Sequence, residues 1–331
     1  MLEELKTFDN ILEYLNNDIK SVLSKIPIDY KENLEEIRLR NGSPLNIYLK
    51  GQDYFISTKG GVLKEINNSL IINQQHINNT FQLITNHSIY AFTEEIKNGF
   101  ITIPGGHRVG IGGKVIYNST EIENIKNISS LNIRIAREKK GISNFLIPYL
   151  LDNKGEFYNT LIISPPQCGK TTLLRDMVRN LSNGNGLCKG FKIGLVDERS
   201  EIAGVYNGLP QRDVGVRTDI LDGCLKFHGI IILIRAMSPN IIAVDEIGGI
   251  KDIEAIREGL RAGIKFIATI HGYGIEDIRN RINLSELIKE KIFKRYIVLD
   301  RSLGVGTIRE IVDGDTFKPI DFKKGVLYGG I

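Results

Sequence analysis

The chain has 331 residues, which is longer than a typical single domain, so we expect two domains, each with its own core. Hydrophobic residues make up 42% and charged residues 25% of the sequence, which excludes a disordered, collagenous or disulfide-scaffold protein. The net charge of +4, from 43 basic and 39 acidic residues, does not indicate a general polyanion binder.

The first part of the chain predicts a compact α+β domain over residues 1–136. Apolar residues at helical spacing predict two helices, over residues 5–15 and about 79–97. Between and after them, alternating apolar residues and turn signals predict short strands, the third and fourth of which form a hairpin around Pro104–Gly106. The expected strands cover residues 37–39, 45–49, 100–103, 109–116 and 131–135.

The pattern changes after residue 136. Residues 137–158 are expected to form a linker and a leading helix, because Arg137–Gly141 is charged and ends in glycine. Residues 159–331 then alternate strands with helices, which predicts an α/β domain with a mostly parallel sheet covered by helices. Helices are expected over 170–181 and 253–263, and strands over 160–164, 192–196, 241–244, 265–270 and 296–299.

Cysteines and apolar runs give expectations about location. The three cysteines, Cys168, Cys188 and Cys224, form no C-x-x-C pair, so we expect neither a disulfide framework nor a zinc site, and a reducing cytosol fits. The first ten residues are charged and lack the apolar core of a signal peptide. Apolar runs such as 230–234 fall far short of the roughly 20 residues that span a bilayer. We therefore expect a cytoplasmic protein that reaches a membrane only through a partner.

A phosphate-binding loop is predicted over residues 160–174, where a buried strand, a tight loop and a helix start follow one another. In such a loop, backbone N–H groups converge on phosphate oxygens, Lys170 reaches the β- and γ-phosphates of ATP, and the Thr171 hydroxyl binds Mg²⁺. The pattern G-x-x-x-x-G-K-[ST] would place glycine at Ser164, and a left-handed backbone there would cost serine about 1 kcal/mol. The alternative is a chance Gly-Lys-Thr sequence at a helix start. The expected nucleotide-binding residues are Ser164, Pro165, Pro166, Gln167, Cys168, Gly169, Lys170, Thr171 and Thr172.

A second acidic site is predicted at the end of the apolar strand 241–244, where Asp245 and Glu246 follow. The carboxyl end of this strand should face the same crevice as the phosphate loop. Asp245 is expected to hold Mg²⁺ through its water shell, and Glu246 to polarise the attacking water. The alternative is an acidic pair that is merely solvated at the surface.

Three further segments narrow the class. Residues 195–201 form a predicted strand that runs into an acidic cluster, and residues 233–240 carry an arginine and then a proline before the strand of 241–244. His271 lies at another predicted strand end. That order resembles the type II and type IV secretion ATPases, in which an "Asp box" and a "His box" accompany the two Walker motifs. Within that class, the runs 165–176, 196–204, 213–219 and 244–249 resemble the stage III sporulation protein AA family of endospore-forming bacteria.

The resemblance implies a RecA-like P-loop domain that hydrolyses ATP, arranged as a hexameric ring, and a membrane-embedded sporulation or secretion component as partner. It implies that Glu198 and Glu201 help to place the water or the magnesium shell, and that His271 senses the γ-phosphate. It also implies arginines that reach the nucleotide of a neighbouring subunit. The candidates are Arg134 and Arg137, with Arg108 and Arg217 as weaker ones. The alternatives are solvated acidic strand ends, an ordinary strand-end histidine and a solvated basic strand edge.

Two other functions stay open at this point. The second domain is of a kind that nucleic-acid motors also use, although the small net charge and the lack of a basic-aromatic tract argue against one, and no specific nucleic acid is expected. A nucleotide-gated scaffold without turnover is the non-enzymatic alternative. Lys170, Thr171, Asp245 and Glu246 together favour turnover, whereas Ser164 argues mildly the other way.

Overall fold

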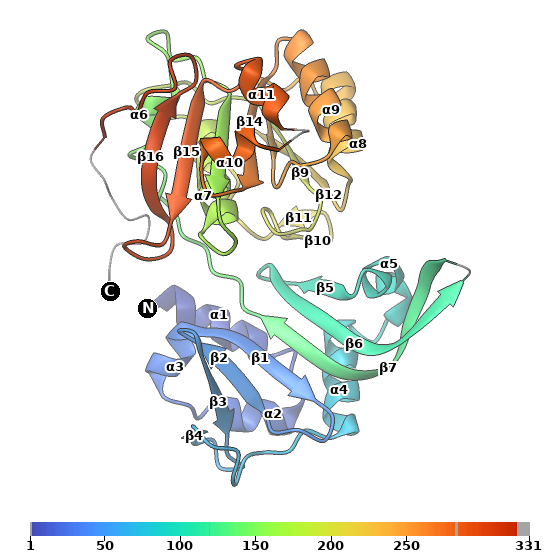
Figure 1. The fold of residues 1–331 in the computed structure, drawn as a ribbon. Helices are drawn as coiled ribbons and strands as arrows, with labels where there is room; N and C mark the ends of the chain where they lie inside the picture. Colours follow the sequence, from blue (N-terminus) through green and yellow to red (C-terminus); the bar gives the residue numbers. More distant parts are fainter. Residues whose placement is uncertain (1, 119, 282–283, 323–331) are drawn as a thin grey trace. The chain divides into compact units, whose positions relative to one another are not determined.

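The computed structural model describes residues 2–118, 120–281 and 284–322, drawn as a ribbon in Figure 1. They group into two compact units, whose boundary lies between Arg137 and Glu138, and the first unit also includes Tyr206–Gln211. Residues 138–158, expected as a linker and a leading helix, belong to the second unit and contain one short helix, α6 (Ile147–Leu150). Among the described residues, no helix is long and apolar enough to cross a membrane.

The first unit is built on an antiparallel sheet of seven strands in the order β4-β3-β2-β1-β7-β6-β5. Its strands are β1 (Leu34–Arg40), β2 (Asn46–Leu49), β3 (Gln52–Ile56), β4 (Val62–Leu63), β5 (Phe100–Ile103), β6 (His107–Asn118) and β7 (Glu121–Arg134). Its helices are α1 (Leu2–Leu12), α2 (Asn17–Leu23), α3 (Ile28–Asn33), α4 (Gln74–Ile84), η1 (Ile89–Phe92) and α5 (Thr93–Lys97). The expected hairpin is present as β5 and β6, with Gly105 and Gly106 at φ of 84° and 69° in its turn.

The single helix expected over residues 79–97 is wrong. The Asn73 side chain accepts a hydrogen bond from the backbone N–H of His76, and this cap starts α4 before the expected position. The helix ends at Ile84, because Asn86 and His87 take up φ values of 47° and 58°, which a right-handed helix does not allow. The chain then turns into the separate short helices η1 and α5.

The second unit contains another sheet of seven strands, in the order β12-β9-β13-β14-β8-β15-β16. All neighbouring pairs are parallel except β15 and β16, so β16 is an antiparallel strand at one edge of the sheet. The strands are β8 (Thr160–Ser164), β9 (Ile193–Asp197), β12 (Thr218–Asp222), β13 (Ile241–Val244), β14 (Lys265–His271), β15 (Arg295–Asp300) and β16 (Thr307–Asp313), beside a small hairpin of β10 (Val205–Tyr206) and β11 (Leu209–Pro210). The five strands expected in this part of the sequence all exist, to within one residue at each end.

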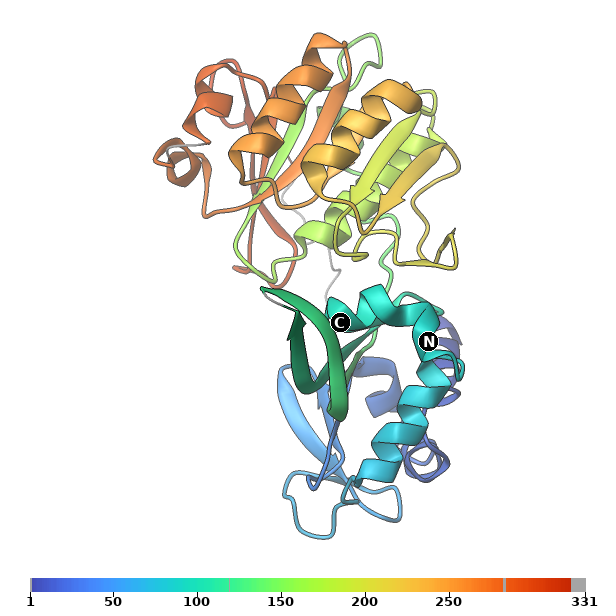
Figure 2. The same ribbon diagram turned by 90° about the vertical axis from the view of Figure 1, so that its right-hand side faces the viewer.

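Helices cover both faces of this parallel sheet. They are α7 (Lys170–Asn183), α8 (Lys226–Ala236), α9 (Ile250–Arg261), α10 (Ile275–Arg279) and α11 (Ser285–Lys289). Strand β8 shows why two layers are needed: Ile162 packs in one core with α7, whereas Leu161 and Ile163 pack in the other with α8 and α9. In Figure 2, α8 and α9 lie side by side as the yellow-orange and orange helices. The inner residues of a strand buried on both faces form an apolar run, as residues 161–163 do.

Candidate nucleotide site

The predicted phosphate loop connects β8 to α7. Helix α7 starts at Lys170, directly after Gly169, whose φ of 85° and ψ of 14° lie in the left-handed region that glycine tolerates. No side chain in the described part of the chain caps this helix start, so its first N–H groups are available to an anion such as a phosphate. The structure does not require glycine at Ser164, because its φ is not positive and the residue simply ends the strand. The cost expected for serine at this position is therefore absent.

Two contacts hold the rest of the loop, one from Arg301 outside it and one within the loop itself. Gln167 has a φ of 58°, and the Arg301 guanidinium donates a hydrogen bond of 2.6 Å to its carbonyl oxygen. The Cys168 side chain is buried, with its sulfur 3.6 Å from the carbonyl oxygen of Pro166. These contacts stabilise a backbone shape that would otherwise cost a non-glycine residue about 1 kcal/mol.

The loop lysine contacts the predicted catalytic carboxylate. Lys170 is only 6% exposed, and its Nζ donates a hydrogen bond of 2.9 Å to Oε1 of Glu246. The Thr171 hydroxyl donates a hydrogen bond of 2.7 Å to Oδ2 of Asp245. The structure thus joins the two predicted motifs residue by residue, Lys170 with Glu246 and Thr171 with Asp245.

Strand β14 lies between the strands that carry these motifs, since the order is β13-β14-β8. All three run parallel, with Val244 opposite Ala268 and His271 opposite Ser164, so their carboxyl ends meet at one edge of the sheet. Thr269, buried in β14, has its hydroxyl against the Asp245 carboxylate and accepts a hydrogen bond of 2.9 Å from the backbone N–H of Glu246. The middle strand therefore orients both acidic residues.

Glu246 is surrounded by basic side chains. Besides Lys170, Nε2 of His271 lies 2.8 Å from Oε1, and the Arg199 guanidinium lies 3.3 Å from Oε2. Burial by itself would raise the pKa of Glu246, but the hydrogen bond and charge of Lys170, together with His271 and Arg199, outweigh burial and lower that pKa. Glu246 is a carboxylate at neutral pH. Its φ of 53° is a left-handed conformation, which places its side chain toward these partners at a small backbone cost.

The acidic segment after β9 is folded around Asp197. Its carboxylate is 2% exposed and accepts hydrogen bonds of 2.9, 3.0 and 2.8 Å from the backbone N–H groups of Glu201, Ile202 and Ala203. Burial raises the pKa of Asp197 in spite of these bonds. Arg175 of α7 donates to the carbonyl oxygens of the same turn, at 2.5 and 2.6 Å. This turn, anchored to α7, carries Arg199 toward Glu246.

The two glutamates expected to place water have different surroundings. Glu198 forms an ion pair with Lys226 at the start of α8, which directs its carboxylate to that helix. The carbonyl oxygen of Glu201 accepts a hydrogen bond from Arg175, and its N–H is bonded to Asp197. Among the described residues, the ion pair of Glu198 is with Lys226 rather than with Lys170.

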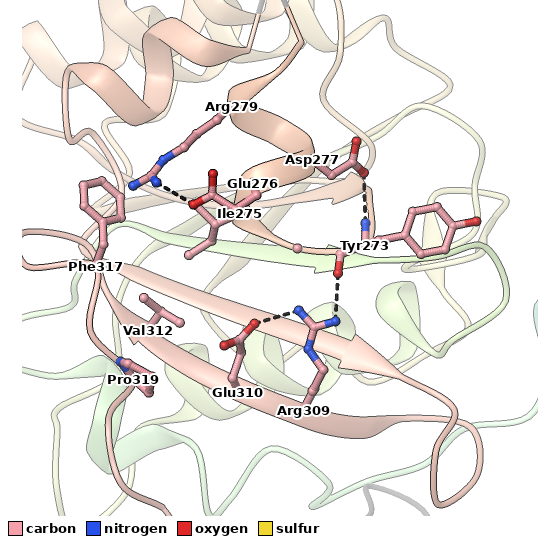
Figure 3. A pocket seen from close by; sticks show the side chains of 11 residues that line it. Tyr273, Ile275, Glu276, Asp277, Arg279, Arg309, Glu310, Val312, Phe317 and Pro319 are labelled. Carbon is pink, nitrogen blue, oxygen red and sulfur yellow. Dashed lines mark hydrogen bonds and ion pairs between the residues drawn. The ribbon is translucent and has the colours of Figure 1, made fainter.

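A cavity of about 420 Å³ lies beside the backbone that follows His271 (Figure 3). Its polar side chains bond to the backbone or to one another: Arg309 donates to the carbonyl oxygen of Tyr273 and pairs with Glu310, and Asp277 accepts from the N–H of Tyr273. Nearby, Arg281 donates a 2.6 Å hydrogen bond to the carbonyl oxygen of His271. Arg309, Asp277 and Arg281 therefore fix the backbone at His271 and Tyr273.

The candidate trans-acting arginines of the first unit differ in their contacts. Arg134, at the end of β7, is 60% exposed and lies 3.8 Å from Glu36. Arg137 donates a 2.9 Å hydrogen bond to the carbonyl oxygen of Leu34. Arg108 lies over the ring of Phe100, with 3.6 Å between the guanidinium carbon and the ring centroid. In the second unit, Arg217 donates to the carbonyl oxygens of Ser182 and Asn183 and so caps the end of α7.

Sequence reasoning missed Thr269, Arg199 and the anchoring role of Asp197. A signal for Thr269 was present, because it precedes His271 by two residues on one strand, and such residues point to the same face. For Arg199, the signal was a lone cation in an acidic strand end. Nothing in the local pattern marks Asp197 as the acceptor of three backbone N–H groups, because that depends on how the turn closes.

Comparison with known proteins identifies a family whose model matches this chain and solved structures with a similar fold. The model of the family described as "Sporulation stage III, protein AA" matches residues 5–317. Stage III sporulation protein AA of Bacillus subtilis (strain 168) is 42% identical over 307 residues, which cover 93% of this chain and 95% of that protein. The structure of the ATPase DotB from Yersinia pseudotuberculosis matches 80% of this chain and 70% of its own, with 14% identity and a TM-score of 0.50. The structure of DotB from Legionella pneumophila matches 80% of this chain and 72% of its own, with 16% identity and a TM-score of 0.49. At such identities the likeness to DotB concerns the fold alone.

Proposed function

This chain belongs to the family Sporulation stage III, protein AA, and from that premise we propose that it is an ATP-hydrolysing motor of a membrane-associated assembly or secretion complex in sporulation. The observation that carries the proposal is the arrangement at the carboxyl ends of β8, β14 and β13. There Lys170 contacts Glu246, and Thr171 contacts Asp245, at 2.9 and 2.7 Å. The P-loop domain is of the RecA-like type in this proposal.

The residues present fit a magnesium nucleotide. An uncapped helix start after a left-handed glycine suits phosphate, and the paired oxygens of Thr171 and Asp245 suit Mg²⁺, which prefers hard oxygen ligands and keeps several waters. When bound, Mg²⁺ would neutralise charge on the phosphate oxygens. Residues 164–172 would surround the phosphates through their backbone, and Lys170 would pair with the β- and γ-phosphates.

Lys170 would then exchange partners. In the structure its ammonium group is bonded to Glu246, and the same donors are needed for phosphate oxygens. Once Lys170 turns to phosphate, Glu246 keeps His271 and Arg199 as neighbours and is free to orient and polarise a water for in-line attack. His271, so placed, would sense whether the γ-phosphate is present.

The finer parts of the proposal concern assembly. We propose a hexameric ring in which Arg134 or Arg137 of one subunit reaches the nucleotide of the next, and in which Glu198 and Glu201 help to order the water shell. Of the two arginines, Arg134 has the more exposed side chain for such a role. The ring would meet the membrane through an embedded partner.

The test combines a mass measurement with an ATPase assay, with and without nucleotide. A ring with turnover supports the proposal, and a nucleotide-binding protein without single-turnover hydrolysis would indicate a scaffold instead. Mixing a Glu246→Gln chain with an Arg134→Ala chain tests action in trans, because a closed ring then pairs an intact site with an intact arginine. In a verified mixed oligomer, absence of any restored turnover would exclude Arg134, and the same experiment with Arg137→Ala tests the alternative.

A further inference from the structure

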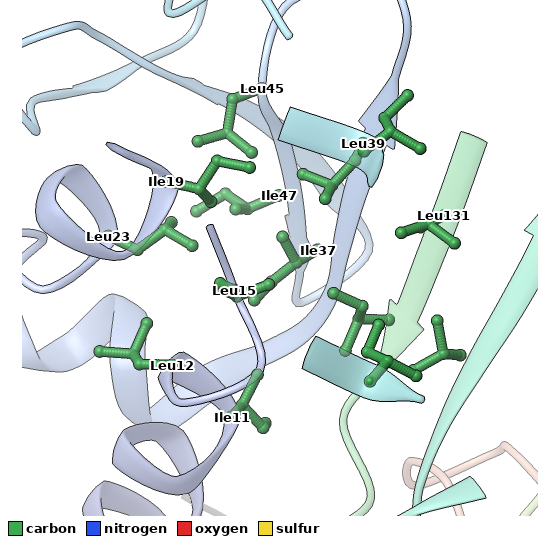
Figure 4. Packing of buried hydrophobic residues seen from close by; sticks show 14 of the residues in the cluster. Ile11, Leu12, Leu15, Ile19, Leu23, Ile37, Leu39, Leu45, Ile47 and Leu131 are labelled. Atoms are coloured by element: carbon green, nitrogen blue, oxygen red, sulfur yellow. The ribbon is translucent and has the colours of Figure 1, made fainter. Parts of the chain in front are cut away.

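Among the described residues, the helices of the first unit share a core with one face of its sheet, and polar side chains lie on the opposite face. Ile37, Leu39 and Leu131 point into the apolar core that the helices cover (Figure 4). Because strand residues alternate between faces, Arg38 and Arg40 of β1 point to the opposite face. A solvated face is ordinary for an antiparallel sheet, but the residues on this one form a repeated pattern.

The strand register produces two matching rows across β1, β7 and β6. Arg38 lies opposite Asn132, which lies opposite Gly110. The neighbouring row is Arg40, Ser130 and Gly112. Each row therefore begins with a guanidinium, continues with a small hydrogen-bonding side chain and ends at a glycine. The rows line a hollow of about 310 Å³, and none of the described residues that line it is acidic.

The charge of the hollow comes from its arginine side. Arg38 is 35% exposed and forms one ion pair, with its Nε 2.6 Å from Oε2 of Glu36. Arg40 is exposed and forms no ion pair within the part of the chain that the structure describes. Guanidinium groups bind carboxylates through two parallel hydrogen bonds, so the arginine side favours an acidic ligand.

A hydrogen-bond acceptor in the floor distinguishes between acidic ligands. Oδ1 of Asn132, which lines the hollow, is buried and has no hydrogen-bond partner among the described residues. A buried acceptor requires a donor. The backbone N–H of a peptide supplies one, whereas the phosphodiester backbone of a nucleic acid carries acceptors only.

We propose that this hollow binds an extended acidic segment of a partner protein, with carboxylates on alternate residues. Arg38 and Arg40 are two residues apart on one strand, a spacing of roughly 6.5 to 7 Å that side chains i and i+2 of an extended peptide share. Gly110 leaves room for the peptide backbone, and Asn132 accepts one of its N–H groups. This peptide site consists of other residues than the nucleotide site, and binding there does not depend on ATP hydrolysis.

Binding is tested by fluorescence anisotropy of the full chain with a short dye-labelled peptide of alternating Glu and Ser. The comparison probe has the same composition with all Glu residues grouped at one end, and a third probe is a single-stranded oligothymidine. The alternating peptide is expected to bind most tightly, with an affinity that falls as salt is added. Equal binding of both peptides would overturn the spacing argument, and tighter arginine-dependent binding of the oligonucleotide would replace a peptide partner with a nucleic acid.

Matched variants separate the site from general charge. The double variant Arg38→Gln/Arg40→Gln should weaken binding of the alternating peptide about tenfold or more. Lys59→Gln/Lys64→Gln removes the same charge from exposed positions of the same unit and should change binding less than about twofold. Equal losses in both variants would exclude a specific site.

A neutral variant tests the glycine floor. A Cβ at Gly110 would lie 3.8 Å from its nearest neighbours on Asn132, so Gly110→Ala fits the folded sheet while filling the hollow. It should weaken peptide binding with no loss of thermal stability, and unchanged binding would contradict the proposed backbone path. Lys170→Ala should bind the peptide as the unaltered chain does, so that failure at the nucleotide site is distinguishable from failure here.

Discussion

Nζ of Lys170 lies 2.9 Å from Oε1 of Glu246, so the lysine that would bind phosphate is bonded to the carboxylate that would activate water. Lys170 is 6% exposed, and a buried ammonium without a partner would be costly. Glu246 thus compensates Lys170 within the folded chain. The two groups are coupled, and substitution of either one changes the surroundings of the other.

Lys170→Ala should lower the affinity for ATP by at least about tenfold, because it removes the flexible cation that would bridge the β- and γ-phosphates. Isothermal titration with ATP and Mg²⁺ measures the change. Glu246→Gln, which keeps the side-chain shape, should retain binding and lose turnover by about 10² to 10⁴-fold. Equal ATP affinity of Lys170→Ala and the unaltered chain would remove the phosphate-binding assignment.

Thr269→Val should destabilise the fold by about 1 to 3 kcal/mol, because it leaves the N–H of Glu246 and the Asp245 carboxylate without their buried partner. Turnover should fall as well, since both acidic residues lose the group that orients them. Thr269→Ser retains the hydroxyl and is the control. Urea unfolding and the ATPase rate measure both effects. If the serine variant lost as much turnover as the valine variant, the hydroxyl would not be the orienting group.

Glu246 should give the folded protein a pH-dependent stability at acidic pH. Its pKa is lowered below the ordinary value of 4.5, so between the folded pKa and 4.5 the unfolded chain binds more protons. The contribution is present above that ordinary value and is lost as the pH falls through the folded pKa. Urea midpoints across the acidic range measure it. Glu246→Gln should reduce the slope, whereas Glu65→Gln, at an exposed position outside the site, should leave it unchanged.

Ser164→Gly restores the glycine of the phosphate-loop pattern and should nevertheless bring no gain in ATP affinity. Ser164 is fully buried at a strand end and its φ is not positive, so glycine would add conformational freedom to the unfolded chain and remove the 2.7 Å hydrogen bond that the Ser164 hydroxyl donates to the carbonyl oxygen of Pro165. A loss of about 0.5 to 1 kcal/mol in stability is expected. Thermal unfolding and nucleotide titration check this prediction, and a clear rise in affinity would mean that the loop changes conformation when it binds.

The sequence alone determined the five inner strands of the second unit's large sheet and the family of the chain. Strands 160–164 and 241–244 were predicted with the bounds they have, because the inner residues of strands buried on both faces form an apolar run that is followed by a loop. The resemblance to the stage III sporulation protein AA family rested on contiguous motifs and is confirmed by the family match over residues 5–317. Apolar runs and family motifs consist of residues that are contiguous in the sequence, so they can be recognised without knowledge of the fold.

Only the tertiary structure decided which strand separates the two motifs. β14 lies between β8 and β13, and this order puts Thr269 against Asp245 and His271 against Glu246. Strand order depends on how residues far apart in the chain are buried together. It therefore cannot be predicted from the local spacing of apolar residues. The lowered pKa of Glu246 has the same origin, because its basic partners come from α7, β14 and the turn after β9, and they come close to Glu246 only once the sheet has formed.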